Sequence, residues 1–102
     1  MYKVIIDRAA EQDLAEIFEY VSATLHAPDA AKRLYRKMKQ EIMSLNAIPS
    51  RCVLIAEEPY NHLGVRKLFI DNYIAFFLVH EDAKEVHVFR VLYSRREWQN
   101  LI

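Results

Sequence analysis

The chain has 102 residues, of which 53% are hydrophobic and 27% are charged, a composition typical of a globular protein and not of a disordered one. A chain of this length buries one modest core, so we predict a single domain that spans residues 1–102. The formal net charge is zero, which argues against a protein that holds nucleic acid by phosphate contacts alone.

The residues that bind metals or form disulfides are few and scattered. Cys52 is the only cysteine, which excludes an intrachain disulfide and indicates a reducing compartment, the cytoplasm. The histidines show no i, i+4 pair and no metal-ligand spacing, so we predict no metal and no cofactor. The N-terminus lacks a signal-peptide pattern and no apolar run approaches membrane-spanning length, so we expect no membrane association.

Charge is distributed unevenly along the chain although it sums to zero. The segment 1–31 is mainly acidic and the segment 32–51 is mainly basic. The basic residues of the second segment are Lys32, Arg33, Arg36, Lys37, Lys39 and Arg51. They are either the solvated face of an amphipathic helix or a contact surface for RNA, DNA or an acidic protein segment.

The first half of the chain predicts one strand and two helices. Residues 3–6 are β-rich and predict the first strand. From Ala9 to about residue 21 the apolar residues recur at the three-and-four spacing of a helix. Pro28 ends that pattern, and Asp29 is expected to cap a second helix that runs to about residue 47. Two helices joined this closely pack as an antiparallel hairpin.

The second half predicts a long loop and three strands. The loop covers residues 50–63, with room for a short strand at 52–55. The strands are expected at about 65–70, 73–80 and 86–93, separated by a tight turn and a polar hairpin loop. The order β-α-α-β-β-β predicts an α+β fold, with a mainly antiparallel sheet, the helical hairpin on one face and a short C-terminal helix or tail.

The sheet face opposite the hairpin has no predicted cover unless residues 95–102 fold across it. The strand at 73–80 is apolar on both sides, as expected of a strand in the sheet interior or at a site that a partner covers. We therefore expect an apolar surface that needs a partner.

Several short motifs occur in an order typical of a known protein family. They are Ala-Ala-Glu-Gln-Asp-Leu-Ala-Glu-Ile at 9–17, Gly-Val-Arg-Lys-Leu at 64–68, Asn-Tyr-Ile-Ala-Phe-Phe at 72–77 and Arg-Val-Leu-Tyr at 90–93, followed by Arg95 and Arg96. With these motifs the whole chain resembles the RelE/ParE superfamily, the toxins of bacterial type II toxin-antitoxin pairs. The resemblance implies the same order of elements and a cognate antitoxin whose segment wraps around the toxin.

The resemblance implies one of two targets. RelE-like toxins cleave messenger RNA on the ribosome, and ParE-like toxins poison DNA gyrase. Lys67 and Arg96 match positions at which RelE-like enzymes carry catalytic basic residues. Ile74 stands where those enzymes carry an arginine, and no tyrosine follows Arg96, where they carry the catalytic one.

The candidate catalytic residues are Arg66, Lys67, Arg90, Tyr93 and Arg96. Metal-free RNA cleavage needs cationic groups that neutralise the developing charge and a group that moves a proton. The four basic residues would supply the charge, and Tyr93 or His87 would move the proton. Arg66 and Lys67 point to opposite faces of their strand, so at most one of them serves a given site.

The candidates also have structural interpretations. Arg90 interrupts an apolar strand and could pair with Asp13 or Glu16 of the first helix, because a charge on an apolar face is tolerated mainly when paired. Tyr93 could pack in the core, and Arg96 could be solvated. Strict alternation would place Arg90 with Val86, Val88 and Leu92, and Tyr93 with His87, Phe89 and Val91.

Three hypotheses about function stay open on the sequence. The first is a ribosome-dependent endoribonuclease, an mRNA interferase built on the candidate residues. The second is an inhibitor that binds DNA gyrase through the helical hairpin and the C-terminal segment, with no chemistry of its own. The third is an inactive relative that keeps only the ability to bind a partner.

Overall fold

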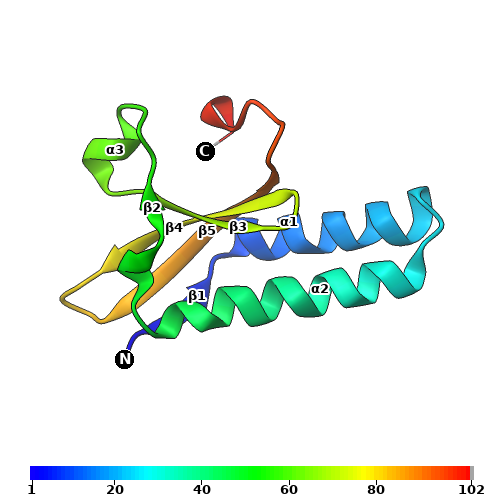
Figure 1. Cartoon of the computed structure of the whole chain (residues 1–102), viewed down its shortest axis with the longest axis horizontal. Helices are drawn as coiled ribbons and strands as arrows, with labels where there is room; N and C mark the ends of the chain where they lie inside the picture. Colours follow the sequence, from blue (N-terminus) through cyan, green and yellow to red (C-terminus); the bar gives the residue numbers. More distant parts are fainter. Residues whose placement is uncertain (102) are drawn as a thin grey trace.

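The computed structural model describes residues 1–101 and shows a five-stranded sheet with two long helices on one face (Figure 1). The helices and strands are β1 (Lys3–Ile6), α1 (Arg8–Glu19), α2 (Pro28–Met43), β2 (Val53–Leu54), α3 (Tyr60–Leu63), β3 (Arg66–Ile70), β4 (Tyr73–His80) and β5 (Glu85–Tyr93). The predicted α+β fold is confirmed, and β2 and α3 lie in the segment predicted as a long loop. Within residues 1–101, no helix is long and apolar enough to cross a lipid bilayer.

The strands lie in the order β1-β5-β4-β3-β2, so the first strand of the chain pairs with the last. β1 runs parallel to β5, and the other neighbouring pairs are antiparallel. A parallel pair needs a long crossover connection, and the hairpin of α1 and α2 lies within it. β4 lies inside the sheet, and its Phe76 and Phe77 are fully buried.

A π-helical turn, Tyr20–Thr24, extends α1 toward the tip of the predicted helical hairpin. α2 then begins at Pro28, whose fixed φ suits the first helical position, and Ala27 occupies the N-cap without a side-chain bond. The expectation that Asp29 caps α2 is wrong, because the helix has already begun at Pro28. Asp29 lies instead in the first turn, where its negative charge interacts favourably with the helix dipole.

The main core lies between the helical hairpin and one face of the sheet. α1 contributes Ala10 and Leu14, and α2 contributes Met38 and Ile42, at the spacing expected of amphipathic helices. The strands contribute Ile70, Ala75, Phe77, Val86, Val88 and Val91. Burial of each large apolar side chain stabilises the fold by roughly 1.5–3 kcal/mol, so this cluster holds both helices against the sheet.

A second core covers the opposite face of the sheet. Trp98, in a 3-10 turn at Trp98–Asn100, packs on Phe76 with ring centroids 5.2 Å apart, and on Tyr60 of α3 at 6.0 Å. Figure 1 shows α3 and the C-terminal turn on the side of the sheet away from α1 and α2. The C-terminal segment, with Trp98 and Leu101, therefore folds across this face, and the chain itself buries Ile74 and Leu92 there. The expectation that this face is an open apolar surface is wrong at these residues.

A β-bulge in β5 changes which residues share a face. Phe77 pairs with Val88 but Phe76 pairs with Arg90, so Phe89 has no partner on β4. The prediction that side chains alternate strictly along this strand, which placed Arg90 with Val86 and Val88, is therefore wrong. The extra residue at the bulge reverses the side-chain direction in the rest of the strand. Val91 joins Val86 and Val88 in the main core, and Tyr93 follows on the side of α1.

Candidate functional site

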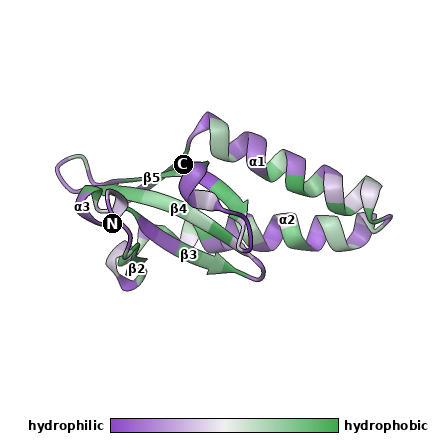
Figure 2. Ribbon diagram, turned by 90° about the horizontal axis from the view of Figure 1, so that it is seen from above, coloured by the Kyte–Doolittle hydropathy of each residue, from purple (hydrophilic) through white to green (hydrophobic). Residues whose placement is uncertain are grey.

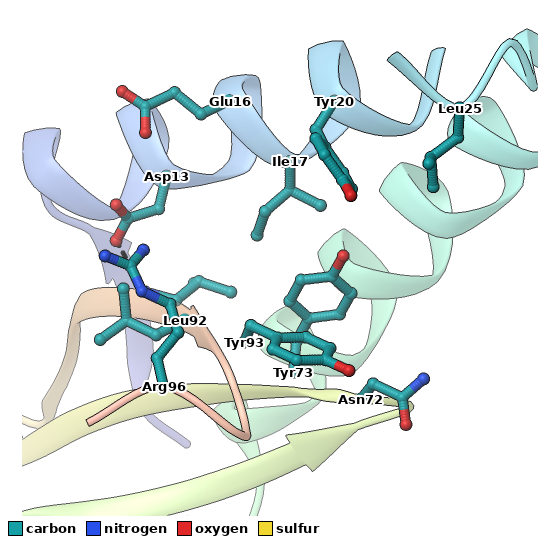
Figure 3. A pocket seen from close by; sticks show the side chains of 11 residues that line it. Asp13, Glu16, Ile17, Tyr20, Leu25, Asn72, Tyr73, Leu92, Tyr93 and Arg96 are labelled. Atoms are coloured by element: carbon teal, nitrogen blue, oxygen red, sulfur yellow. Dashed lines mark hydrogen bonds between the residues drawn. The ribbon is translucent and has the colours of Figure 1, made fainter. Parts of the chain in front are cut away.

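A groove lies between the second half of α1 and the adjoining ends of β4 and β5 (Figure 3). Its volume is about 630 Å³. The apolar and aromatic lining consists of Ile17, Tyr20, Leu25, Tyr73, Val91, Leu92 and Tyr93. The polar lining consists of Asp13, Glu16, Asn72 and Arg96.

The groove exists because β5 is longer than its neighbour β1. The last pair between these strands joins Ile6 to Val88, while β5 continues to Tyr93. Beyond Val88 the edge of β5 has no strand beside it, and α1 packs there instead. The residues after the bulge therefore border a helix, and the π-helical turn continues that wall past the end of α1.

Three tyrosines form the aromatic part of the groove. Tyr73 and Tyr93 lie opposite each other on β4 and β5, with ring centroids 5.7 Å apart and planes at 69°. Burial raises the pKa of Tyr73, and the nearby Tyr93 and Tyr20 raise it further, so this phenol is neutral. Tyr20 is 52% exposed and Tyr93 is 40% exposed. Accessible aromatic surface with hydroxyl groups is typical of protein contact sites.

In the described part of the chain, Asp13 is the one buried charged residue. Its carboxylate binds the side chain of Arg90. Arg90 Nε and Nη2 donate to the two carboxylate oxygens of Asp13 at 2.7 and 3.0 Å. The Val91 amide donates to the same carboxylate at 2.9 Å, so Asp13 supplies an acceptor at the open edge of β5. The expected structural pairing of Arg90 is thus present, and the hydrogen bond to Asp13 raises the pKa of Arg90.

Arg90 also holds the C-terminal segment. Its Nη1 donates to the carbonyl oxygen of Leu101 at 2.7 Å. The Tyr60 hydroxyl donates to the carbonyl oxygen of Gln99 at 2.6 Å, which fixes the same segment from the α3 side. All three guanidinium nitrogens of Arg90 therefore bond to groups of the chain itself.

Arg96 lies at the rim of the groove, just after β5, with an exposed side chain. Figure 3 shows this side chain pointing toward Asp13, but no ion pair of Arg96 forms within residues 1–101. The backbone N–H of Arg96 donates to the carbonyl oxygen of Tyr93 at 3.1 Å, which keeps the two residues together. The lining of the groove therefore includes one accessible guanidinium, at the Asp13 end, and the partly exposed ring of Tyr93.

Arg66 and Lys67 lie on β3, outside the lining of the groove. Arg66 Nη1 donates to the carbonyl oxygen of Cys52 at 2.6 Å. Lys67 points to the other face of the strand, with Nζ 5.5 Å from the centre of the Phe69 ring. The two side chains diverge as strand alternation predicts, and neither lines the groove with Tyr93 and Arg96.

His87 is also separate from the groove. Its Nε2 lies 2.9 Å from Glu85 Oε1, and its Nδ1 lies 3.5 Å from Asp7 Oδ1. The hydrogen bond to Glu85 raises the pKa of His87 above its usual value, although partial burial opposes this. The proton carrier proposed as an alternative to Tyr93 therefore interacts with other acids and not with the groove.

The structure thus brings Tyr93 and Arg96 together and puts Arg90 beside them through Asp13. Tyr20, Leu25 and the groove do not belong to any motif that the sequence singles out as a site. The pattern that points to them is the continuation of apolar side chains beyond the stripe of the first helix, toward the tip of the hairpin. Within residues 1–101, no group of three or more potential metal-ligating side chains occurs. The arrangement can bind an apolar segment and place one positive charge against it.

Comparison with known proteins identifies the family. A family model described as the ParE toxin of the type II toxin-antitoxin system parDE matches residues 4–98. No curated protein sequence matches the chain.

Solved structures with this fold include toxin-antitoxin complexes. The chromosomal ParDE system of P. aeruginosa aligns with a TM-score of 0.74 and 23% identity, covering 91% of this chain and 96% of the other. The RelBE2 complex of Mycobacterium tuberculosis aligns with a TM-score of 0.67 and 17% identity, covering 90% of both chains. The E. coli RelBE complex aligns with a TM-score of 0.60 and 14% identity, covering 94% of this chain and 100% of the other. At these identities the likeness is one of fold.

Proposed function

Because the chain belongs to the ParE toxin family of type II toxin-antitoxin systems, we propose that it inhibits growth by binding DNA gyrase, without chemistry of its own. The groove, with the tip of the helical hairpin and the segment around Arg96, is the proposed contact surface. A cognate antitoxin would neutralise the toxin. The chain would act as a single domain in the cytoplasm, where its target is found.

The observation that carries this proposal is the dispersal of the candidate catalytic residues. Cleavage of RNA without a metal needs several cations and a proton carrier at one phosphate. Arg90 is bound to Asp13 and Leu101, and Arg66 is bound to the Cys52 carbonyl oxygen. Among residues 1–101, Arg96 is the one cation in the groove lining. A single positive charge is too little to stabilise a phosphorane, but it suits a contact with a protein.

The composition of the groove supports a protein contact. Tyrosine and arginine are enriched among the residues that dominate binding energy in protein interfaces. Tyr20, Tyr93 and Arg96 are accessible from solvent, and their neighbours Ile17 and Leu25 offer apolar area. An apolar segment of the target, flanked by an acidic side chain opposite Arg96, would fit this lining.

The test compares a groove variant with a matched control in a supercoiling assay with purified gyrase. Tyr20→Ala removes an exposed aromatic ring from the groove, so the toxin concentration that gives half inhibition should rise about tenfold or more. Phe69→Ala removes a ring that is 57% exposed on β3, outside the groove, and should leave inhibition unchanged. Equal effects of the two substitutions would contradict the groove as the contact surface.

A ribosome-dependent mRNA interferase is the second candidate, favoured by the shared position of Tyr93 and Arg96 at the groove. The two functions differ in what fails first after induction. Gyrase poisoning should give double-strand breaks and a DNA-damage response, whereas ribosomal cleavage should give messenger breaks in frame with codons. Broken DNA with intact messenger RNA supports our proposal, and the reverse pattern contradicts it. Normal growth at high expression would indicate an inactive relative that only binds a partner.

A further inference from the structure

The exposed face of α2 carries a row of cations that the proposed gyrase contact does not use. We define the α2 cation row as Lys32, Arg33 and Arg36, which are all exposed; Arg36 lies four residues after Lys32 and three after Arg33, so it is a neighbour of both on the helix surface. None of the three forms an ion pair within residues 1–101. Lys37 continues the row, but its Nζ is bound to Asp71 at 2.6 Å.

The positive and negative charges of the chain sum to zero, but the fold places them on different surfaces. α1 and α2 lie side by side (Figure 2), and the exposed charges in the second half of α1 are Glu16 and Glu19. The middle of the exposed face of α2 carries only basic side chains. A polyanion would therefore be repelled along α1 and attracted along α2, although the net charge is zero.

We propose that the α2 cation row binds the phosphate backbone of duplex DNA. Arginine presents a planar fork of donors that matches a phosphate, and Gln40 adds an amide one turn further along. A helix rises about 1.5 Å per residue, so Lys32 and Arg36 lie about 6 Å apart along the axis. Along the axis of the duplex, each DNA strand carries one charge about every 3.4 Å, so neighbouring phosphates lie within reach of the row.

The same face is poorly suited to a protein partner. The exposed positions from Asp29 through the α2 cation row to Gln40 include no apolar or aromatic side chain. A protein interface draws most of its energy from buried aromatic and apolar anchors, whereas contact with a phosphate backbone needs none. This inference depends on the charge of α2 and not on the identity of the protein target.

The test is a salt series of DNA binding with the purified full chain. Fluorescence anisotropy with a labelled duplex of arbitrary sequence should show weak binding that is independent of sequence. Three phosphate contacts predict a slope of about −2.7 for log K against log salt, so affinity should fall about 40-fold between about 50 and 200 mM salt. The variant Lys32→Gln/Arg33→Gln/Arg36→Gln should lose this slope, and its helix should persist because glutamine is a good helix former.

The matched control removes the same charge from other exposed positions, Lys3→Gln/Arg8→Gln/Arg95→Gln. Each triple variant lowers the formal net charge from zero by three. An equal loss of binding in the control would overturn the proposal, because net charge would then matter and not the row. A polyglutamate peptide that binds as tightly as DNA with the same slope would also overturn it, in favour of an acidic protein surface. Melting curves of both variants that match the unchanged chain would show that folding is intact.

Discussion

Replacement of Asp13 with alanine should destabilise the fold strongly, because this carboxylate on α1 accepts three hydrogen bonds from two neighbouring residues of β5. It binds Arg90 Nε at 2.7 Å and Nη2 at 3.0 Å, and the Val91 amide at 2.9 Å. The alanine variant would leave a guanidinium without its counterion and a backbone N–H without an acceptor at the edge of β5.

The size of the loss follows from the burial of the pair. Removal of one partner of a buried ion pair typically costs about 3–5 kcal/mol, which includes the charge left unpaired. The Arg90 side chain keeps 25% exposure, so water can solvate part of it and we expect the lower end, about 3 kcal/mol. In a domain of this size each 1 kcal/mol lowers Tm by about 4–8 °C, so Tm should fall by about 12–24 °C.

Urea denaturation followed by circular dichroism measures this free energy of unfolding, and the midpoint should fall while the slope m stays constant. Glu16→Ala is the matched control, since Glu16 lies near Asp13 on α1 but is exposed and makes no ion pair among the described residues. Its effect should stay within about 0.5 kcal/mol. An Asp13→Ala protein within that same margin of the unchanged chain would refute the view that the pair holds α1 to β5.

Three further predictions concern the groove, the histidine and the second core. Arg96→Ala should leave Tm unchanged, because the side chain is exposed, and should weaken gyrase inhibition about tenfold or more; full inhibition by the variant would exclude Arg96 from the contact. The raised pKa of His87 means that its charged form stabilises the fold fully below the unfolded pKa of about 6.5, and that this stabilisation is lost as pH rises through the folded pKa. The Tm of the unchanged chain should therefore fall as the pH rises above about 6.5, and the Tm of His87→Gln should fall less over the same range; parallel curves would contradict this. Trp98→Ala should cost about 3–5 kcal/mol in urea denaturation, because the ring packs on Phe76, and a loss below about 1 kcal/mol would remove the C-terminal segment from the core.

Local patterns in the sequence predicted most of the fold. Apolar spacing placed α1 and α2 within a few residues of their ends, since each helix buries one stripe on a single core. The short turn after Ile70 separated β3 from β4, because Asp71 tolerates the left-handed conformation, φ 52°, that the turn requires. These features depend on neighbours in the chain, so the sequence alone is enough to predict them.

The features that the sequence did not predict depend on residues far apart in the chain. The bulge at Phe89 lies in a run with no glycine, and it becomes visible only in the pairing of β5 with β4. The sequence offered Asp13 or Glu16 as the partner of Arg90 and left the choice open; Asp13 is the partner, and its carboxylate also accepts the Val91 amide at the open edge of β5. The groove follows from both, so its lining could not be assembled from the separate motifs.

The pairing of β1 with β5 also determines at what point during synthesis the toxin can complete its fold. Lys3 pairs with Glu85, so β1 can join the sheet only after most of the chain has been synthesised. Contacts between such distant residues form late and slowly, because the intervening chain must first be closed into a loop. A polypeptide released early by a nonsense mutation would lack the partner of β1 and one wall of the groove. Premature termination should therefore yield harmless fragments, and inactivating mutations of this kind should be recessive to an intact copy of the gene.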